Sequence, residues 1–549
     1  MSDAQVLVVG AGPTGLALAL WLAKLGVRVR IVDKAAEPGT TSRALVVQAR
    51  ILEQYDQIGI AKGIVEHGIP MAAANMWIKG RKVVRAAFGE MGKGISPYPF
   101  ALVYPQDAHE KYLVARLGEM GVEVERCVEL AGFEQDAGRV RARLRPADGA
   151  EEIVEAAYIA GCDGAHSIVR EAIRAGFPGG TYDHMFYVAD VIATGKVMNR
   201  ELHVAFDTAD FLLVFPLIEP GHARLVGTVK DSALGKGSAL AWEDVSQRVV
   251  ESMGIEIGKV NWFSTYHVHH RVPNAFRAQR AFLLGDAAHV HSPVGGQGMN
   301  TGIGDAINLA WKIAWVLQGG ADPAVLDTYE CERRAFARRL VATTDRGFSF
   351  VMQNGPLARF VRLRIAPHVV HAVASSEMGR RLMFRTISQT NVNYRGCALS
   401  AGVAGRVHGG DRLPWVELDT RPDGFGDNFE PLRSLAWQVH VYGERTEELT
   451  RYCETHKFSL HVFAWRPAME RAGFARNAVY LVRPDGYVAS ASRGIPASKK
   501  ASAIRYGVHG SWEPGLSTRP TCNGMIGSHS VWTPGEFDGN TMPRTGDCA

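Results

Sequence analysis

The sequence predicts an α/β protein with several domains. Three observations support this prediction. A glycine-rich turn joins a strand to a helix near the N-terminus, two later apolar strands each run into a turn that pairs glycine with aspartate, and the chain has 549 residues. At roughly 150 residues per domain, that length suggests three or four domains or subdomains. Hydrophobic residues make up 46% of the chain, which is enough for a sizeable core and argues against global disorder.

Composition narrows the choice of partners. The formal net charge is +5, with 61 basic and 56 acidic residues and no long basic block, so nucleic acid is not expected as a partner. The N-terminus lacks the basic start of a signal peptide. The longest apolar helices expected are about half as long as a membrane-spanning helix needs to be. The seven cysteines form no Cys-x-x-Cys pair. We therefore expect reduced thiols in a cytoplasmic protein that binds no membrane.

The N-terminal segment has the pattern of a βαβ unit. Gln5–Val9 is a short apolar strand, Leu16–Leu25 carries apolar residues at helical spacing, and Val27–Val32 is a second strand that ends at Asp33. The turn after the first strand has the spacing Gly-x-Gly-x-x-Gly, and the acid follows about 20 residues later. This context predicts a dinucleotide-binding site; the alternative is a plain strand–helix turn without a ligand.

Each residue of the turn has a physical role in such a site. Gly10 permits a tight turn, Gly12 lets the backbone approach a pyrophosphate, and Gly15 lets the helix pack closely on the strand. The first N–H groups of the helix lack partners within it, and together with the partial positive charge of the helix end they favour phosphate groups. Asp33 can accept hydrogen bonds from a ribose diol.

Two later segments carry related signals. Tyr158–Arg170 has the sequence YIAGCDGAHSIVR, an apolar strand followed by Asp163 and Gly164 and then by the start of a helix. Leu283–Gly302 has the sequence LLGDAAHVHSPVGGQGMNTG and changes from a buried strand to a helix through a run of small residues. Small residues there let backbone N–H and C=O groups approach something large and flat.

In this order, the motifs GAGPTG, GCDGAHSIVR and LLGDAAHVHSPVGGQGMNTGIGDAINLAWKIA resemble those of the single-component flavoprotein aromatic hydroxylases, the class that includes phenol and p-hydroxybenzoate hydroxylases. Two further segments agree with the family, SRALVVQARILE at Ser42–Glu53 and YPQDAHEKYL at Tyr104–Leu113. The resemblance spans residues 5 to about 340 and is specific because the three motifs occur together.

The resemblance implies a Rossmann-like FAD-binding domain, an inserted β-sheet substrate domain and a C-terminal thioredoxin-like α/β domain. The expected boundaries are 1–180 for the first part of the FAD-binding domain (with residues from about 70 to 105 contributing to the substrate domain), 181–275 for the substrate-binding sheet, 276–400 for the second part of the FAD-binding domain, 401–496 for the thioredoxin-like domain and 497–549 for an irregular tail. The strands expected in the substrate sheet are Tyr187–Val191, Leu202–Phe206, Phe211–Leu217 and Arg224–Lys230.

The resemblance also assigns residues to FAD. Asp286 is expected near the ribityl and pyrophosphate groups, Pro293 beside the flavin ring, and the backbone of residues 298–300 beside its pyrimidine end. Asp163 would serve both FAD and NAD(P)H. The helix that follows, with one apolar stripe, would point its positive end at the ring. The expected cofactor-binding residues are Gly10, Gly12, Pro13, Thr14, Gly15, Asp33, Lys34, Arg43, Gln106, Asp163, Asp286, Pro293, Gly298, Met299 and Asn300.

The implied activity is that of an FAD-dependent monooxygenase. NADPH or NADH passes hydride to FAD, reduced flavin takes up O2 at C4a, and the hydroperoxide transfers a hydroxyl group to an electron-rich aromatic ring. A dry pocket keeps the hydroperoxide from decaying to H2O2. No second Gly-x-Gly-x-x-Gly follows a strand in the sequence, which suits a family in which NAD(P)H docks transiently.

The expected substrate is a phenolic or polycyclic aromatic compound, hydroxylated ortho or para to an existing hydroxyl group. Neutral and polycyclic phenols are favoured over simple benzoates. Phe211, Leu213 and Phe215 alternate along one strand, so they could line an apolar pocket, although ordinary sheet core has the same pattern.

Arg43 and Pro293 are the candidate catalytic residues, but the sequence assigns no base. Some relatives have an acid or a histidine in the segment that corresponds to Leu45–Val47, where this chain has three apolar residues. Arg43, Tyr98 or a chain of water molecules are the remaining candidates for the base.

Residues 402 to about 492 resemble the thioredoxin-like C-terminal domain of the phenol hydroxylase branch, with strands expected at Ala436–Tyr442, Ser459–Ala464 and Ala478–Val482. Cys453 has no cysteine three residues away, so we expect a role in packing or dimerisation instead of thiol redox chemistry. The sequence leaves open whether the protein forms a homodimer.

The histidines of the chain do not predict a metal site. His267, His269 and His270 lie on one expected strand without a carboxylate or cysteine at ligand spacing. His289 and His291 are expected to form local hydrogen bonds.

Three alternatives remain at the level of sequence. A flavin-dependent halogenase shares the N-terminal motif, but its Trp-x-Trp-x-Ile-Pro signature is absent from the sequence, and Trp311 and Trp315 lie in a helix. Another FAD oxidoreductase of the same fold is the second alternative. A flavin-binding interaction protein without catalysis is the third, and the unassigned base keeps it open. A test of NAD(P)H oxidation with and without phenols separates it from an enzyme.

Overall fold

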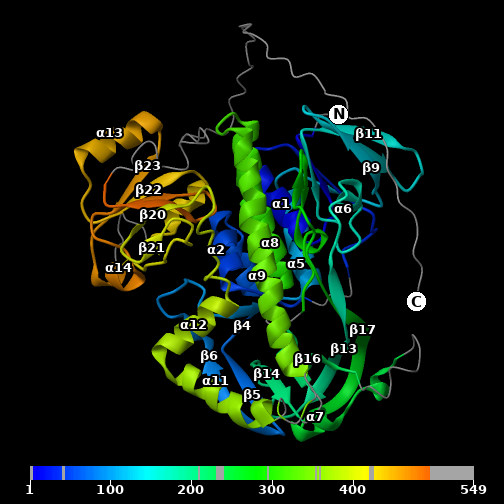
Figure 1. Ribbon diagram of the computed structural model, residues 1–549. Helices are drawn as coiled ribbons and strands as arrows, with labels where there is room; N and C mark the ends of the chain where they lie inside the picture. The colour runs from blue at the N-terminus through cyan, green and yellow to red at the C-terminus, as the bar shows by residue number, and fades with distance from the viewer. Residues whose placement is uncertain are drawn as a thin grey trace, which may run out of the picture. The chain divides into compact units, whose positions relative to one another are not determined.

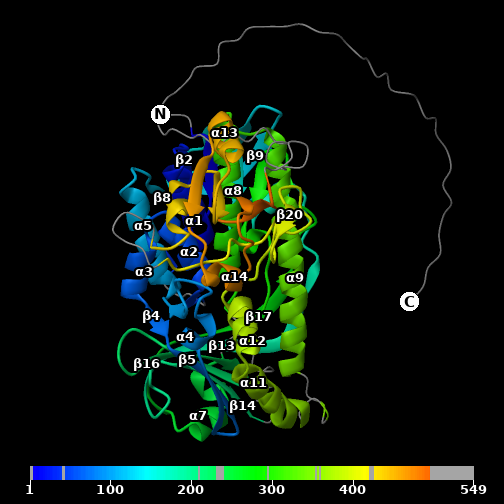
Figure 2. The same ribbon diagram turned by 90° about the vertical axis from the view of Figure 1, so that its left-hand side faces the viewer.

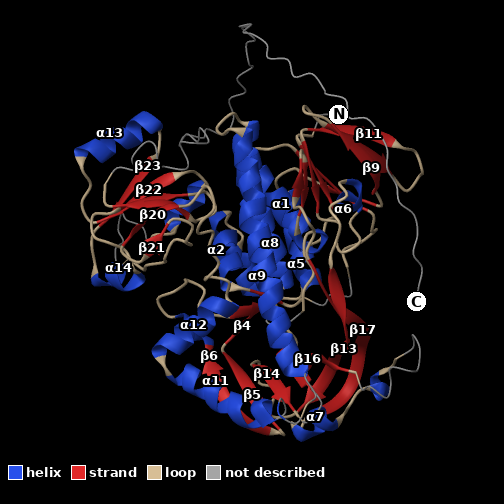
Figure 3. Cartoon of the chain, in the orientation of Figure 1, coloured by secondary structure: helices blue, strands red, loops and turns tan. Residues whose placement is uncertain are grey.

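The computed structural model describes residues 4–39, 44–207, 211–229, 240–292, 296–352, 355, 357, 360–418 and 426–494. In these parts of the chain the strands form five sheets: two of six strands, one of seven and two of three. Helices accompany the larger sheets, as Figure 1 and Figure 3 show. The predicted α/β class is therefore confirmed.

The first six-stranded sheet brings the three sequence motifs together. Its order is β18-β19-β12-β1-β2-β8, and all neighbours are parallel except β18 and β19. Because parallel strands end at one edge of a sheet, the turns after β1, β12 and β19 lie near one another. The strands are β1 (Val6–Val9), β2 (Val29–Asp33), β8 (Val124–Arg126), β12 (Tyr158–Gly161), β18 (Arg277–Ala278) and β19 (Ala281–Leu283).

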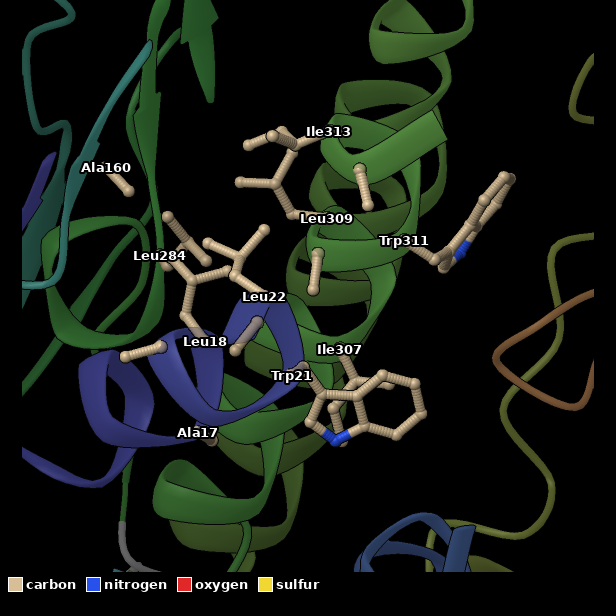
Figure 4. Close-up of a cluster of buried hydrophobic side chains, with 14 of the residues drawn as sticks. Ala17, Leu18, Trp21, Leu22, Ala160, Leu284, Ile307, Leu309, Trp311 and Ile313 are labelled. Atoms are coloured by element: carbon tan, nitrogen blue, oxygen red, sulfur yellow. The ribbon is translucent and has the colours of Figure 1, made fainter. Parts of the chain in front are cut away.

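Two helices form the core against this sheet. α1 (Pro13–Lys24) packs against α8 (Gly298–Leu317). Figure 4 shows Leu22 of α1 and Leu309 of α8 in one cluster with Leu284, which follows β19; all three side chains are buried. The helix and the second strand expected in the βαβ unit are thus present, each shifted by a few residues.

The helix α8 differs from its prediction in one respect. The sequence predicts a single buried stripe that includes Ile307, but Trp311 and Ile313 outside that stripe are also 0% exposed. A helix that is apolar around its circumference lies inside a core. The middle of α8 is therefore packed on several sides.

Other elements surround this core. The three-stranded sheets have the orders β11-β10-β9 and β3-β7-β4. Their strands are β3 (Val46–Val47), β4 (Ile69–Met71), β7 (Ala101–Val103), β9 (Glu129–Gln135), β10 (Val140–Arg145) and β11 (Glu152–Ala156). The helices are α2 (Ala49–Gln57), α3 (Ala61–His67), α4 (Phe88–Gly92), α5 (Gln106–Gly118), α6 (Ile168–Ala172), α7 (Arg248–Ser252), α9 (Asp327–Met352), α11 (Ala366–Ser375) and α12 (Glu377–Ile387). Short 3-10 or π turns are η2 (Trp242–Asp244), η3 (Gly285–Ala287), η4 (Pro323–Leu326), η5 (Val361–Ile365) and η6 (Glu430–Ser434).

The seven-stranded sheet has the order β17-β13-β16-β15-β14-β5-β6 and is antiparallel except between β14 and β5. Its strands are β5 (Ala73–Ile78), β6 (Arg81–Ala87), β13 (Gly179–Thr194), β14 (Leu202–Phe206), β15 (Phe211–Pro216), β16 (His222–Thr228) and β17 (Glu256–Arg271). All four strands expected here are present, and the one expected at Tyr187–Val191 is much longer. Figure 2 shows β13, β14 and β17 with α7 beside them.

A separate six-stranded sheet is formed by the C-terminal part of the described chain, in the order β21-β20-β25-β24-β22-β23. Its strands are β20 (Ala401–Ala404), β21 (Val407–His408), β22 (Gln438–Tyr442), β23 (Ser459–Phe463), β24 (Val479–Val482) and β25 (Val488–Ser492), and its helices are α13 (Glu447–His456) and α14 (Pro467–Ala472). The three strands expected in this region are present. The tail 497–549 lies outside the described residues.

Buried ion pairs join this C-terminal segment to the helices of the first domain. Glu332 of α9 accepts hydrogen bonds from Arg483 at 2.7 and 3.0 Å and from the Lys312 ammonium of α8 at 2.8 Å, and all three side chains are 0% exposed. Burial alone would raise the pKa of Glu332, but Arg483 and Lys312 outweigh burial and lower the pKa to about 2. The carboxylate is therefore charged at neutral pH.

We predict that Glu332→Gln lowers the free energy of unfolding by about 3 kcal/mol, because it leaves the buried Lys312 ammonium without its counter-charge and Arg483 with Asp485 alone. The folded-state pKa of Glu332 lies below its unfolded value, so this stabilisation is complete above about pH 4.5 and is lost as the pH falls toward 2. Thermal melting at several pH values should show the difference between the two proteins narrowing in acid. Glu155→Gln, at an exposed pair with Arg139, is the matched control and should melt like the wild type. Equal melting of all three proteins at pH 7 would contradict the prediction.

Candidate functional site

The first glycine-rich turn has the geometry of a phosphate cradle. Gly10 has a φ of +100°, which favours glycine, and a Cβ there would lie 2.3 Å from the carbonyl oxygen of Cys162. A Cβ on Gly15 would lie 1.9 Å from the carbonyl oxygen of Gly10. Gly12 differs, because it caps α1 and no described atom lies within 4 Å of a Cβ built on it. Packing thus requires two glycines, whereas the third faces open space at the helix N-terminus.

Asp33 ties this turn to the neighbouring strand. Its Oδ2 accepts a hydrogen bond from the N–H of Ala11 at 2.6 Å, and its Oδ1 accepts one from the N–H of Ala35 at 2.8 Å. The Arg126 guanidinium lies 3.8 Å from the same carboxylate, and Lys34 next to it is exposed. A carboxylate has about four lone-pair sites, so Asp33 can hold the turn and still accept hydrogen bonds from a ligand.

Asp163 follows β12 and caps the short helix α6. Its Oδ2 accepts hydrogen bonds from the N–H groups of Ile168 at 2.8 Å and Val169 at 3.2 Å. Its Oδ1 is buried and has no hydrogen-bond partner among the described residues. Burial raises the pKa of this carboxyl. An unpartnered buried oxygen is costly, so Oδ1 is suited to accept a hydrogen bond from a bound molecule.

Thr14 brings the first and third motifs into contact. A Cβ on Gly285, which has a φ of +59°, would lie 2.6 Å from the Thr14 hydroxyl oxygen, and a Cβ on Gly302 in α8 would lie 2.3 Å from it. Glycine at both positions therefore lets the N-terminal ends of α1 and α8 approach each other. Two helix N-termini in one place combine unpaired N–H groups with positive potential.

Asn300 fixes the N-terminal end of α8 to the strand β3. Its side-chain amide donates to the carbonyl oxygens of Val46 at 2.8 Å and Gly296 at 2.9 Å, and its Oδ1 accepts a hydrogen bond from the N–H of Gln48 at 2.8 Å. The side chain is 0% exposed. The sequence predicts a backbone role for this residue and misses the side-chain bridge, because Val46 lies 254 positions away.

A buried ionic network supports the turn after β19, and the sequence does not predict it. Asp305 of α8 accepts hydrogen bonds from Arg333 at 2.6 Å and from the N–H of Gly285 at 3.1 Å, and His289 lies 2.7 Å from its Oδ2. Burial alone would raise the pKa of Asp305, but Arg333 and His289 lower it. The members of this network come from separate elements, so they form no sequence motif that would predict it.

The local roles expected for the two histidines of this turn are confirmed. His289 pairs with Asp305, and His291 Nδ1 lies 2.8 Å from the carbonyl oxygen of Ser292. Burial, followed by the nearby His289, lowers the pKa of His291 to about 4. His291 is therefore neutral at physiological pH.

The remaining expected cofactor residues lie on several elements. Gln106 begins α5, and its side-chain amide donates to Glu110 at 2.7 Å. Asp286 is exposed on the turn after β19, and Gly298 and Met299 begin α8. Arg43 and Pro293, the two candidate catalytic residues, lie outside the described residues.

The strand β15 presents an apolar face. Phe211, Leu213 and Phe215 are partly exposed on one side, while Leu212 and Val214 between them are 1% exposed and belong to the core of the seven-stranded sheet. The predicted alternation is thus confirmed, and it separates a core face from a partly exposed apolar face.

This apolar face continues toward the turn at Gly296, just before α8. Phe215 and Leu202 pack against a buried cluster that includes Val46, the residue whose carbonyl Asn300 binds. A Cβ on Gly296 would lie 3.5 Å from the Val46 side chain. Val46 therefore lies next to both the turn at Gly296 and the cluster against which Phe215 packs.

One buried ion pair lies on the same face of the sheet. Arg224 is opposite Phe215 in the register of β15 and β16, and it donates to both oxygens of Asp190 at 2.7 and 2.8 Å. Its side chain is 6% exposed and lies over the ring of Trp262. Such a bidentate pair is satisfied internally, so the face remains mainly apolar. The sequence alone does not predict this pair.

Tyr98, a candidate for the base, is poorly suited to that role. Burial raises the pKa of its phenol, and Asp56 raises it further. The group therefore stays protonated at neutral pH, whereas a general base needs a pKa near the working pH.

The described part of the chain has neither a metal-binding cluster nor a helix that could cross a membrane. No group of three or more His, Cys, Asp or Glu side chains there is arranged to hold a metal ion. His269 of β17 instead lies 2.7 Å from the Thr181 hydroxyl. None of the helices has the length and apolar character that crossing a bilayer requires.

Comparison with known proteins agrees with this geometry. Residues 3–344 match a family model described as an FAD binding domain. The chain is 33% identical over 513 residues to 6-methylpretetramide 4-monooxygenase of Streptomyces rimosus, covering 88% of this chain and 90% of that protein. It is 31% identical to pentachlorophenol 4-monooxygenase of Sphingobium chlorophenolicum, covering 76% and 77% of the two chains.

A solved structure extends the likeness to the whole fold. The anhydrotetracycline hydroxylase OxyS from Streptomyces rimosus superposes with a TM-score of 0.73 at 27% identity, covering 92% of this chain and 99% of that chain. The two named monooxygenases, the family model over residues 3–344 and the three motifs at one sheet edge all agree. The chain belongs to the FAD-dependent aromatic hydroxylase family.

Proposed function

We propose that this protein is a monooxygenase that binds FAD, uses NADPH or NADH and O2, and hydroxylates a polycyclic phenol ortho or para to an existing hydroxyl group. One observation carries the proposal. An apolar sheet face continues through Val46 to Gly296, in the turn before α8, and the N-terminal ends of α1 and α8 lie close together there. A flat cofactor on that turn would meet an aromatic substrate on that face.

The residues present fit FAD. The open space at Gly12 would admit the pyrophosphate, and Asp33 has acceptor capacity left for the ribose. The buried, unpartnered oxygen of Asp163 offers a further acceptor. Gly298 and Met299 would hold the ring end, with Asn300 fixing their backbone. Lys34, Gln106 and Asp286 are further proposed contacts, and Arg43 and Pro293 are proposed from the family motif alone.

Bound FAD would supply hydride acceptance from NAD(P)H and the activation of O2. The protein would supply position, exclusion of water and charge stabilisation. The N-terminal end of α8, buried and fixed by Asn300, would stabilise negative charge on the reduced ring. The apolar residues 45–47 would keep water away from the reacting atoms.

The substrate class follows from the lining of the proposed pocket. Phe211, Leu213 and Phe215 offer extended apolar contact, and the buried Arg224 is already neutralised by Asp190. A free carboxylate would find no uncompensated cation there among the described residues of the sheet face. Neutral polycyclic phenols fit this surface better than benzoates do, in line with 6-methylpretetramide and pentachlorophenol in the names of two relatives.

We also propose the domain roles. The segments 1–180 and 276–400 would bind FAD, and 181–275 with about 70–105 would cover the substrate. The C-terminal segment 401–496 is proposed to be thioredoxin-like, as its mixed sheet with α13 suggests. Cys453 in α13 is buried, and burial raises its pKa to about 11. A buried, protonated thiol is inert, which supports a structural role.

Gly12→Val and Gly15→Val form a matched test of the FAD site. Gly12→Val should leave the fold intact but fill the pyrophosphate space, so the purified protein should be colourless and melt like flavin-free wild type. Gly15→Val places atoms against the Gly10 carbonyl and should yield little folded protein. The measurements are flavin absorbance at saturating FAD and thermal melting. A Gly12→Val protein that retains full flavin absorbance would show that the cofactor is elsewhere.

The reaction itself is tested with a panel of polycyclic and single-ring phenols. We expect NAD(P)H oxidation that is stimulated by the substrate, and one atom of 18-O2 in the ring beside or opposite the hydroxyl group. Mass spectrometry of the product checks this. Oxygen that comes from water, or a halogenated product, would refute the monooxygenase assignment.

Phe215→Ala tests the proposed substrate face. We expect KM for a polycyclic phenol to rise about tenfold, since roughly 1.4 kcal/mol of apolar contact is lost, while KM for a single-ring phenol changes less. Leu212→Ala on the core face is the control: it should lower the melting temperature without changing the preference between the two substrates. An identical change in KM for both phenols would argue against this pocket.

A further inference from the structure

Two cysteines from distant parts of the sequence meet outside the proposed flavin site. Cys331 lies in α9, and Cys397 lies in the segment that leads to β20. Both are free thiols, and their sulfur atoms are 2.7 Å apart although 66 positions separate the residues. The two side chains are therefore directly adjacent, and a disulfide bond of about 2.05 Å could form with only a small movement of the sulfur atoms.

The backbone around each thiol is held in place. Next to Cys331, Arg333 donates hydrogen bonds to Asp305 at 2.6 Å and to the Tyr394 hydroxyl at 2.9 Å. On the other side, the N–H of Cys397 donates to the carbonyl oxygen of Tyr394 at 3.1 Å. The pair Arg333–Tyr394 therefore clamps the two segments a few residues from each sulfur, and the thiols remain neighbours without a covalent link.

A small oxidant can reach this pair. Cys331 is exposed and lines a surface hollow of about 550 Å³ together with Arg277, Arg334 and Arg338. Cys397 is half-buried, and burial, followed by its contact with Cys331, raises its pKa to about 12. The exposed sulfur is therefore the one that an oxidant meets first, and the covered sulfur is the second partner.

We infer that Cys331 and Cys397 form a peroxide-sensitive disulfide site. Hydrogen peroxide oxidises the Cys331 thiol to a sulfenic acid and releases one water molecule. The Cys397 sulfur then attacks the Cys331 sulfur, a second water molecule leaves, and the S–S bond forms. In sum, two thiols and one H2O2 give one disulfide and two molecules of water.

The disulfide would fasten α9 to the segment before the C-terminal sheet. It would close a loop of 65 residues that contains the rest of α9, α11 and α12. Closing a loop of this length restricts the unfolded chain, and the contact already exists in the folded state. The oxidised protein should therefore melt a few degrees above the reduced protein, and a thiol reductant should reverse the change.

The experiment treats the full-length, reduced protein with a small excess of H2O2, blocks free thiols and maps the peptides by mass spectrometry. We expect one cross-linked peptide pair that contains Cys331 and Cys397, with the loss of two hydrogens. Cys331→Ser and Cys397→Ser should each abolish it. The matched control Cys453→Ser, at a buried cysteine in α13, should leave it unchanged.

A chemical trap resolves the order of events. In Cys397→Ser, dimedone should label Cys331 after peroxide treatment, whereas in Cys331→Ser it should not label Cys397. Non-reducing electrophoresis should show monomer-sized protein throughout. Two unmodified thiols after peroxide treatment of the folded protein, or a cross-link between two chains instead of within one, would overturn the inference. Both outcomes are independent of whether the protein hydroxylates phenols.

Discussion

The close approach of the N-terminal ends of α1 and α8 is the constraint on which the rest of the structure depends. It requires glycine at 285 and 302, because a Cβ at either position would collide with the Thr14 hydroxyl. Two buried side chains of α8 hold this end in place: the Asn300 amide donates to the Val46 carbonyl oxygen, and the Asp305 carboxylate accepts a hydrogen bond from the N–H of Gly285. Two helix ends with unpaired N–H groups thus lie close together.

The sequence predicts the parts of this arrangement that depend on local chemistry. Gly10 and Gly15 have the close contacts that their spacing indicates, and β15 alternates as its pattern indicates. The network around Asp305 and the pair of Arg224 with Asp190 were missed, because each joins elements that are far apart in the sequence. Hydrophobic periodicity and motif spacing reveal how nearby residues along the chain are arranged. Such ion pairs depend instead on which strands and helices become neighbours in space.

The same limit explains the connection to the C-terminal sheet. Arg483 is part of an RPDG sequence that signals only a turn, yet it is 0% exposed and pairs with Glu332, which lies 151 positions away. Asp485 also pairs with Arg483, so two buried carboxylates balance two buried cations, and removing one of the four charges leaves a buried partner unpaired. The sequence indicates that a separate module follows the first domain, but the buried charges that make the two depend on each other appear only in three dimensions.

The apolar segment at 45–47 links this architecture to the proposed chemistry. The carbonyl oxygen of Val46 accepts a hydrogen bond from the Asn300 amide, and the Val46 side chain belongs to the cluster against which Phe215 packs. One residue therefore contacts both the N-terminal end of α8 and the sheet face. A carboxylate or imidazole in its place would be charged or polar in an apolar cluster, at a cost unless it were paired. If the pocket is apolar and holds no base, the hydroxyl group of the substrate would have to ionise unaided to give the electron-rich phenolate. A hydroxyl group conjugated with a carbonyl within a fused ring system is more acidic than an isolated phenol, so it would form that phenolate more readily.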